Sequence, residues 1–372
     1  MKVDFFLACP SEIDDYLPIY HLLLQKGVDA QFVLLKPHKK QPPHTKENFN
    51  DLLAVLCRRN LNFIHRILPS VDIVITTGTS TPLQKYKKMR IKMRYGVGLN
   101  KDNPHYEEYA NVGFDGILVH GEFERERFAS LHAPERIKAM GMPKYDTFFH
   151  SPSLTGDELK KKLPLDSSKK TLVYLPTWGE HSSIELLFSS LKKLSEEFEI
   201  VVKPHSHTEV FSSEKTRFQK LKQLTRFVLP SSTPIHEPLA LADLVIADAK
   251  SGAAPEAALL FPKVPLVTIT PFQSSLFFEE INLLGPVLNQ PHDLKTCVRS
   301  MMSNDSYEVK RRQFRDYAFA CDSISGAEKA VKGMLELSEM QPISQQYTKK
   351  LRKEKNILSR LKRSIQKRFK KC

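Results

Sequence analysis

Three side chains of the segment IVVKPHSHTE (200–209) are suited to chemistry on a charged group: Lys203, His205 and His207. They follow a short run of β-branched apolar residues, which is typical of a buried strand. A cation beside an imidazole suits a developing negative charge and proton transfer near neutral pH. We therefore predict catalytic roles for Lys203 and His205; the alternative is a structural histidine at a strand end. Histidines at this spacing without a carboxylate cluster are weak metal ligands, so we expect no metal.

A second segment, ADLVIADAKSGAAPEAALLFPKVPLV (242–267), has the order strand, polar loop, helix. Asp248, Ser251 and Gly252 occupy the loop, where free helix amides and a hydroxyl would cradle a diphosphate. Glu256 lies one turn into the helix and would accept hydrogen bonds from the ribose of the same nucleotide. The alternative is that Ser251 only caps the helix and Glu256 only favours its dipole.

The segment TLVYLPTWGE (171–180) is a strand that ends in Pro-Thr-Trp-Gly. The Thr177 hydroxyl and the following glycine would contact phosphate. Trp178, the only tryptophan of the chain, would stack on a base or line a cleft; alternatively, it is a core residue at an interdomain corner. Together with the two segments above, this one predicts a nucleotide site at the carboxyl edge of a parallel sheet.

Small-residue loops also follow strands in the first part of the chain. We expect them to form the acceptor side of a cleft and its hinge, although glycine in such loops also serves turns with a positive φ. One of these loops contains His120. The four segments are TTGTSTP (76–82), YGVGLNKD (95–102), VHGEFE (119–124) and GMPKYD (141–146).

Alternating strand and helix patterns must position these loops. Short apolar runs rich in β-branched residues are separated by helical periodicity, which predicts βαβ units and parallel sheets. The predicted strands are 3–8, 30–35, 71–76, 91–95 and 116–119, then 171–175, 200–202, 227–229, 244–247 and 265–269, and helices are predicted at 11–25, 46–68 and 122–131.

The strand pattern is interrupted at 151–170, where Ser, Pro, Gly, Lys and Asp replace periodic apolar residues, and a chain of 372 residues is long enough for two cores. The expected fold class is therefore α/β, with two Rossmann-like, doubly wound parallel-sheet domains that face a cleft, as in the GT-B architecture. We predict an N-terminal acceptor-side domain (1–150), a linker (151–170), a C-terminal domain that binds the nucleotide donor (171–340) and a basic tail (341–372).

The basic excess of the chain is concentrated in that tail. The net charge is +14, and residues 348–372 contribute +11 through twelve basic residues and one acidic residue. Apolar residues recur among these cations at helical spacing, which predicts a basic amphipathic helix on an anionic membrane surface. A solvated tail and a nucleic-acid arm are the alternatives; nucleic acid is the least expected partner, because no Tyr or Trp is interleaved for base stacking. The apolar positions are Leu351, Leu358, Leu361, Ile365 and Phe369.

Cysteine usage and hydropathy favour a cytoplasmic protein that is peripheral on the inner face of the cell membrane. The five cysteines are far apart and form no C-x-x-C pair. The apolar run at the N-terminus meets acidic residues almost at once, which suits a buried strand better than a signal peptide. No run reaches the roughly 18 apolar residues of a membrane span.

Taken in order, GMPKYD, YLPTWGE, KPHSHTE and the segment 242–267 resemble the CDP-glycerol glycerophosphotransferase family, which builds teichoic-acid and related capsule polymers. The corresponding family segments are a G-x-P-R-x-D turn, a Y-A-P-T-[FW]-R strand end, an R-x-H strand end and a T-D-Y-S-S diphosphate loop followed by a helix. The resemblance spans 95–267. It implies nucleotide and phosphate roles for Thr177, Lys203 and Ser251, and it places His205 on a catalytic histidine of the family.

The first-domain W-H-G-T-P-x-K segment of the family departs most in this chain, where 95–101 reads YGVGLNK. Gly96 occupies the position of the histidine, so His105 or His120 is a candidate replacement, or the mechanism differs. The loop after Asp248 is also similar to the S-G-G-x-x-E-E-A diphosphate loop of UDP-N-acetylglucosamine 2-epimerases and of GT-B enzymes that use NDP-sugars.

These observations together predict a transferase that moves a polyol phosphate from a CDP-linked donor to a lipid-linked cell-surface polymer. The acceptor hydroxyl would attack the β-phosphorus in line, and CMP would leave. His205 would act as acid or base or would stabilise the transferring phosphoryl group, and Lys203 would offset charge. No cofactor is expected beyond the nucleotide-activated donor. The alternatives are a GT-B glycosyltransferase that uses an NDP-sugar for capsule or lipopolysaccharide-type glycans, and a non-catalytic membrane- or nucleic-acid-binding protein on a degenerate transferase fold.

Overall fold

The computed structural model describes ten ranges of the chain, and these include the motifs of the second half almost completely. The predicted basic helix (348–372), His105 and the greater part of the loops 76–82 and 95–102 lie outside them. The described residues are 1–7, 12–37, 43–78, 86, 88–96, 113–130, 132–150, 163–271, 279–320 and 325–343.

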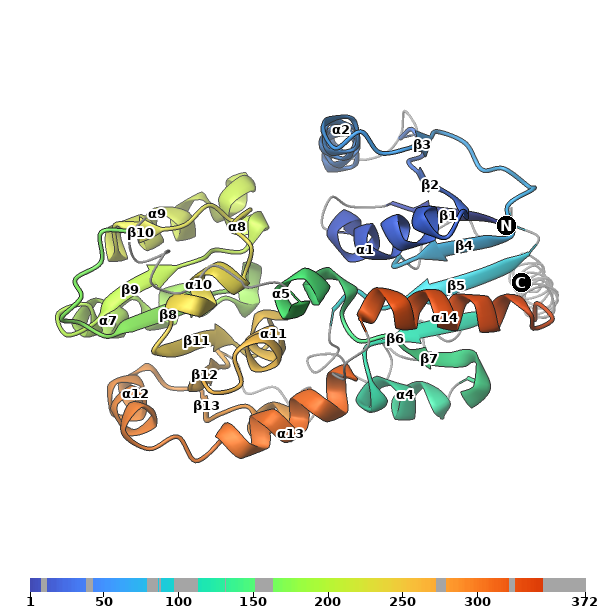
Figure 1. The fold of residues 1–372 in the computed structure, drawn as a ribbon. Helices are drawn as coiled ribbons and strands as arrows, with labels where there is room; N and C mark the ends of the chain where they lie inside the picture. Colours follow the sequence, from blue (N-terminus) through green and yellow to red (C-terminus); the bar gives the residue numbers. More distant parts are fainter. Residues whose placement is uncertain are drawn as a thin grey trace, which may run out of the picture.

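The first domain is built on a parallel sheet of seven strands (Figure 1). Strand order reverses between the strands β1 and β4, so the carboxyl ends of these two neighbours diverge into a crevice. The apolar strand residues are buried because helices cover both faces of the sheet, as parallel sheets require. In sheet order the strands are β3 (Phe63–Ile64), β2 (Asp29–Val33), β1 (Lys2–Phe6), β4 (Ile73–Thr76), β5 (Met89–Met93), β6 (Gly116–Val119) and β7 (Ile137–Ala139).

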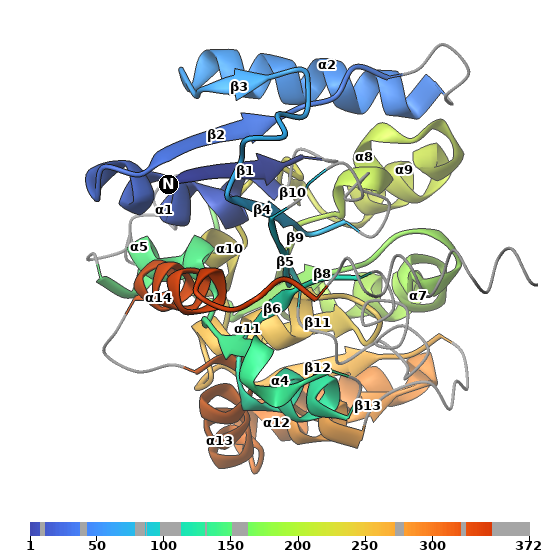
Figure 2. The same cartoon turned by 90° about the vertical axis from the view of Figure 1, so that its right-hand side faces the viewer.

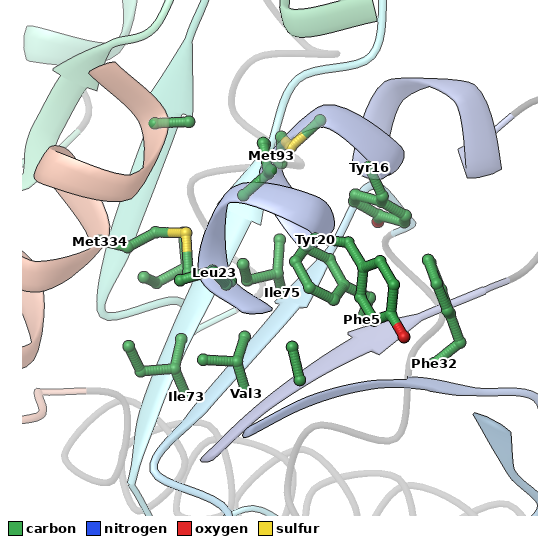
Figure 3. Close-up of a cluster of buried hydrophobic side chains, with 14 of the residues drawn as sticks. Val3, Phe5, Tyr16, Tyr20, Leu23, Phe32, Ile73, Ile75, Met93 and Met334 are labelled. Atoms are coloured by element: carbon green, nitrogen blue, oxygen red, sulfur yellow. The ribbon is translucent and has the colours of Figure 1, made fainter. Parts of the chain in front are cut away.

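Helices α1 (Glu12–Gln25) and α14 (Gly326–Ser338) pack side by side on one face of this sheet (Figures 1 and 2). Figure 3 shows the aromatic and aliphatic side chains of α1 above those of β1, β2 and β4, with Met334 of α14 beside them. Helix α2 (Pro43–Arg58) adds to the same core, whereas α4 (Glu122–Ala129) packs on the other face.

The second domain repeats this construction on a parallel sheet of six strands. One face is covered by α7 (Ile184–Leu194), α9 (Lys215–Leu224) and α12 (Leu294–Ser303), and the other by α10 (His236–Leu241), α11 (Ala253–Leu260) and α13 (Glu308–Phe319). Strand order reverses between β8 and β11, which creates a second crevice. In sheet order the strands are β10 (Phe227–Val228), β9 (Glu199–Val202), β8 (Thr171–Leu175), β11 (Leu244–Asp248), β12 (Leu266–Ile269) and β13 (Val287–Leu288).

The predicted fold class is confirmed: the chain forms two doubly wound parallel-sheet α/β domains, and each of the ten predicted strands is present. The predicted helix 46–68 is wrong in its second half. Asn60 adopts the left-handed conformation with φ +52°, which ends the helix, and the chain then pairs as the edge strand β3.

Helix α14 lies in the range predicted for the second domain (171–340), but it packs on the first sheet. Its buried stripe joins the core formed by α1 and β1, because the chain crosses back between α13 and α14. The members of this stripe are Ala327, Ala330, Val331, Met334 and Leu337. The first domain is thus completed by the end of the described chain.

The chain passes between the domains twice, and the GMPKYD segment at the first passage contacts the second passage at the start of α14. This segment contains η4 (Pro143–Tyr145) and the start of α5 (Asp146–His150). The Asp146 carboxylate accepts hydrogen bonds from the amides of Gly326 (2.7 Å) and Ala327 (2.8 Å) and so holds the first turn of α14. Gly141 has a φ of +71° beside the carbonyl of Phe319, which explains the glycine. The segment therefore lies where a hinge is expected.

Candidate functional site

Asp248 ends strand β11 and joins the two loops at the crevice of the second sheet. Its Oδ2 accepts hydrogen bonds from the amides of Thr177 (2.6 Å) and Ser183 (3.3 Å). The side chain is fully buried, and its Oδ1 has no hydrogen-bond partner among the described residues. Burial raises the pKa of Asp248 to about 7. Asp248 was predicted to bind the donor; its place beneath the loop suits it to positioning Thr177 instead.

Ser251 and Gly252 lie between β11 and α11, as predicted. Gly252 is the N-cap residue of α11, and the hydroxyl of the preceding Ser251 accepts a hydrogen bond from the first helix amide, that of Ala253 (3.1 Å). Among the described residues, a Cβ added at Gly252 would have one neighbour within 4 Å, the Glu256 carboxylate at 4.0 Å. The helix N-terminus is therefore approachable by a ligand at the carboxyl edge of the sheet, beside the Thr177 loop.

Glu256 links the two domains. Its Oε1 accepts from Lys144 Nζ (2.9 Å), and its Oε2 accepts from the Tyr145 hydroxyl. Burial opposes ionisation, but Lys144, Tyr145 and Lys203 outweigh it and hold the pKa of Glu256 below its ordinary value. Because both oxygens already have partners, the predicted hydrogen bonds to a ribose would have to displace them.

Lys203 and His205 follow β9, on the strand next to the Thr177 loop. The ammonium of Lys203 is largely buried; burial lowers the pKa of Lys203, while Glu256 opposes this effect. His205 Nδ1 accepts a hydrogen bond from the His207 amide (3.1 Å), which caps the short helix α8 (Ser206–Val210). Burial first, then His207 and Lys203, lower the pKa of His205 to about 4. The imidazole is therefore neutral near pH 7.

The cap determines which tautomer His205 adopts. Since Nδ1 accepts a backbone N–H, the proton of the neutral ring must reside on Nε2. Such a ring donates a hydrogen bond and has no free lone pair for a substrate proton. Of the two predicted roles for His205, the geometry favours stabilisation of a phosphoryl group over general acid-base catalysis.

Trp178 lies beside these histidines on the second domain. Its ring centroid is 4.5 Å from that of His207 and 6.1 Å from that of His205, and Phe211 lies at 6.0 Å. With 39% of its surface exposed, Trp178 is not the interdomain core residue of the alternative prediction. Part of its surface therefore remains open to a ligand.

His120 follows strand β6 in the first domain and is buried. Its Nδ1 is 3.0 Å from Glu124 Oε2, and its amide donates to the same oxygen at 3.1 Å. Arg94 Nε donates to Glu124 Oε1 at 3.0 Å. Burial opposes ionisation of Glu124, but Arg94 and His120 keep the pKa of Glu124 below its ordinary range. His120 is thus part of a buried polar cluster with Glu124 and Arg94.

Asp15 and Lys144 are site residues that the sequence did not single out individually. Asp15 stands in the first turn of α1, and its Oδ1 is 4.0 Å from Lys144 Nζ, which in turn contacts Glu256. Burial raises the pKa of Asp15 to about 7, while Lys144 opposes the rise. Lys144 belongs to the GMPKYD motif, so the sequence could have indicated it. No sequence motif contains Asp15, because its partners come from distant segments.

No group of three or more His, Cys, Asp or Glu side chains that could hold a metal ion occurs among the described residues. In the same part of the chain, every helix is too short or too polar to span a bilayer.

A comparison with family models matches residues 63–251 to the family described as CDP-glycerol:poly(glycerophosphate) glycerophosphotransferase. This range contains Thr177, Lys203, His205, Asp248 and Ser251. The resemblance predicted from the four ordered motifs is confirmed. A comparison with curated proteins finds no match.

Solved structures with related architecture cover nearly the whole chain. The wall teichoic acid polymerase TagF is 17% identical with a TM-score of 0.57, and 94% of this chain and 90% of that chain are covered. The UDP-GlcNAc 2-epimerase from Neisseria meningitidis, bound to UDP-GlcNAc, is 12% identical with a TM-score of 0.62 and coverages of 90% and 100%. A glycosyltransferase from Rickettsia africae is 11% identical with a TM-score of 0.58 and coverages of 90% and 98%. At such identities the likeness shows a shared fold.

Proposed function

The chain belongs to the CDP-glycerol:poly(glycerophosphate) glycerophosphotransferase family, and from this premise we propose that it extends a lipid-linked cell-surface polymer. The family assignment confirms the predicted class of reaction, in which a transferase moves glycerol phosphate from CDP-glycerol to a polymer acceptor. The lipid linkage of the acceptor and the roles of individual residues are our proposals.

In the proposed reaction, an acceptor hydroxyl attacks the phosphorus that carries glycerol. A bond forms between the hydroxyl oxygen and this phosphorus, and the bond from the phosphorus to the bridging oxygen breaks. The hydroxyl proton passes to a base, and CMP leaves with the bridging oxygen. Negative charge on the transferring group and on CMP must be stabilised in the transition state.

The observation that supports this function best is the meeting of three strand ends at the crevice of the second sheet. Thr177 follows β8, Lys203 follows β9, and Ser251 follows β11, and these three strands are neighbours. We assign the diphosphate to the N-terminus of α11, where helix amides and the Thr177 loop converge. We assign base stacking on the cytosine to Trp178, which follows Thr177 directly and is 39% exposed.

Lys203 and His205 supply positive charge and a hydrogen bond to the transferring group. The Lys203 ammonium lies among groups from both domains, since the charges of Glu256 and Lys144 both act on it. The His205 ring offers its Nε2–H, held in place by the cap that Nδ1 forms. A neutral donor of this kind stabilises developing charge without transferring a proton.

The leaving nucleotide tests the function directly. The purified protein is incubated with CDP-glycerol, CDP-ribitol or a UDP-sugar and a glycerol-phosphate primer, and the products are identified by mass spectrometry. We expect CMP and a primer longer by one glycerol phosphate. Release of a nucleoside diphosphate would support glycosyl transfer instead, and no turnover with any donor would support a binding protein on a transferase fold.

We further propose that the tail 348–372 holds the enzyme on the inner face of the cell membrane, close to its lipid-linked acceptor. Its net charge of +11 and its apolar positions at helical spacing support this location. Full-length protein should sediment with vesicles containing phosphatidylglycerol at low salt, and protein truncated before Thr348 should not. Equal binding of both forms would overturn the membrane role of the tail.

A further inference from the structure

We propose that Asp15 is the general base that accepts the proton of the acceptor hydroxyl, with Lys144 as the residue that positions it. The inference rests on the proposed function, because a base is needed only if a hydroxyl is the attacking group. It adds to that function a catalytic residue from the first domain.

Asp15 lies at the edge of the first domain that faces the donor site. It occupies the first turn of α1, directly after β1 at the crevice of the first sheet, and this end of the helix points toward the second domain (Figure 1). Lys144 Nζ stands 4.0 Å from Asp15 Oδ1 and 2.9 Å from Glu256 Oε1. Glu256 belongs to the first turn of α11, so two side-chain contacts separate Asp15 from the diphosphate loop.

Other titratable groups near the proposed site are less suited to accept a proton from a substrate. His205 Nδ1 accepts a backbone amide, and both oxygens of Glu256 accept hydrogen bonds. His120 and Asp248 are buried, at 1% and 0% exposure, so a substrate hydroxyl has no approach to them. Asp15 has no hydrogen bond among the described residues; its nearest cation is Lys144. Its side chain keeps 9% of its surface exposed, which leaves an approach for a hydroxyl.

The charges around Asp15 suit a base that works near neutral pH. Lys144 of η4 favours the ionised carboxylate, whereas Glu256 of α11 and the neighbours Asp14 and Glu12 on α1 oppose it. With burial, the balance raises the pKa of Asp15 to about 7. A base is most effective when its pKa lies near the working pH.

The step balances without a further reactant. The hydroxyl O–H bond breaks and its proton moves to an Asp15 oxygen as the new O–P bond forms. The bond from phosphorus to the bridging oxygen of CMP breaks and its electron pair leaves with CMP. Water removes the proton from Asp15 after the product departs.

The test compares wild type with Asp15→Asn over a range of pH. We expect kcat of Asp15→Asn to fall by about 10²-fold or more, with KM for CDP-glycerol changed by less than about threefold. The acidic limb of the wild-type kcat profile, near pH 7, should be absent in the variant. A structural role would leave that limb in place.

Asp14→Asn is the matched control, since Asp14 sits on the same turn, is exposed and, among the described residues, pairs with Arg59 at 2.7 Å. It should keep wild-type kcat above pH 8 and retain the acidic limb, moved only slightly to lower pH, because Asp14 adds less than burial does to the raised pKa of Asp15. Asp15→Glu retains a carboxylate and should recover at least tenfold over Asp15→Asn, which separates loss of the base from loss of folding.

The outcomes separate this inference from the proposed function. If wild type releases CMP and Asp15→Asn keeps its rate and pH profile, the base assignment is wrong while the function stands. If wild type does not turn over CDP-glycerol with a primer, the proposed function itself fails. A loss in Asp15→Asn that Asp15→Glu does not recover, together with a lowered melting temperature, would also overturn the assignment.

Discussion

The two halves of the cleft are constructed differently, although both rest on doubly wound parallel sheets. On the donor side, Thr177, Lys203 and Ser251 follow three neighbouring strands, and each is positioned by bonds within its own domain. On the acceptor side, Asp15 from α1 meets Lys144 from η4, and this lysine is held by a carboxylate of the other domain.

This difference indicates which part of the site depends on the relative position of the domains. The donor loops are fixed by short-range geometry and do not need the first domain to keep their shape. Lys144 connects Asp15 of the first domain (4.0 Å) to Glu256 of the second domain (2.9 Å), so the charges around Asp15 depend on the contact between the domains. The predictions below aim to break or sharpen this distinction.

The largest effect is expected on the donor side, at His205. His205→Ala should lower kcat by roughly 10²- to 10³-fold, the usual cost of losing one donor to transition-state charge. Glutamine can place an N–H near the position of Nε2, whereas asparagine can replace only the cap made by Nδ1. We therefore expect His205→Gln to keep more activity than His205→Asn, and His205→Asn to keep more stability than His205→Ala.

Steady-state CMP release and urea denaturation measure the two properties separately. His292→Ala is the control, because His292 is an exposed histidine elsewhere in the second domain and should change neither quantity. Equal activities of His205→Gln and His205→Asn would contradict the Nε2–H role, and full activity of His205→Ala would remove His205 from the mechanism.

The next effect concerns the contact between the halves. Lys144→Met removes the cation from a buried pair and leaves Glu256 with a weaker set of partners, which should cost about 3 kcal/mol in the free energy of unfolding. Loss of the positive charge should also raise the pKa of Asp15 further, because Lys144 now opposes that rise. The acidic limb of the kcat profile should move to higher pH.

An exposed pair provides the control for Lys144→Met. Lys170 contacts Asp243 at 2.9 Å with 68% of the lysine side chain exposed, so Lys170→Met should cost less than about 1 kcal/mol. Urea denaturation of both variants gives the comparison. If both variants lost a similar free energy of unfolding, the Lys144 contact would contribute no more to stability than an exposed ion pair does.

The same contrast explains how much of the site was predictable from sequence. A strand followed by a polar loop and a helix is a local pattern, so Thr177, Lys203 and Ser251 could be proposed from sequence, and the strand pattern predicted both sheets. Asp15 carries no local signal, since its surroundings come from η4 and α11. The sheet on which α14 packs was likewise not predictable, because an amphipathic helix does not specify its partner.

Each half of the cleft contains one buried carboxyl whose pKa is raised to about 7, Asp15 and Asp248. For Asp248 the ordinary value is 3.8, so the folded state binds the proton more tightly than the unfolded state. Protonated Asp248 therefore stabilises the folded protein at low pH. This contribution to the free energy of unfolding is lost as the pH rises from about 4 to 7, by at most about 1.4 kcal/mol per pH unit. Asp248→Asn should remove this slope.

Urea denaturation of wild type and Asp248→Asn between pH 4.5 and 8 isolates the contribution of Asp248. The free energy of unfolding of the variant, relative to wild type, should rise with pH up to about 7 and then level off. Asp15→Asn should show the same direction. A difference that stays constant with pH would mean that Asp248 ionises at an ordinary pKa in the folded protein.

The smallest effect is expected at Gly96, where the family resemblance leads one to expect a histidine. A Cβ at Gly96 would have no atom of the described residues within 4 Å, so Gly96→His should fold normally. If Asp15 already supplies the base, a second base gives little benefit, and kcat should stay within about threefold of wild type. The CMP-release assay at pH 7 measures this, with Gly96→Ala as the control for the added Cβ. A gain of more than tenfold for Gly96→His alone would mean that the wild-type cleft lacks a base, and it would count directly against Asp15.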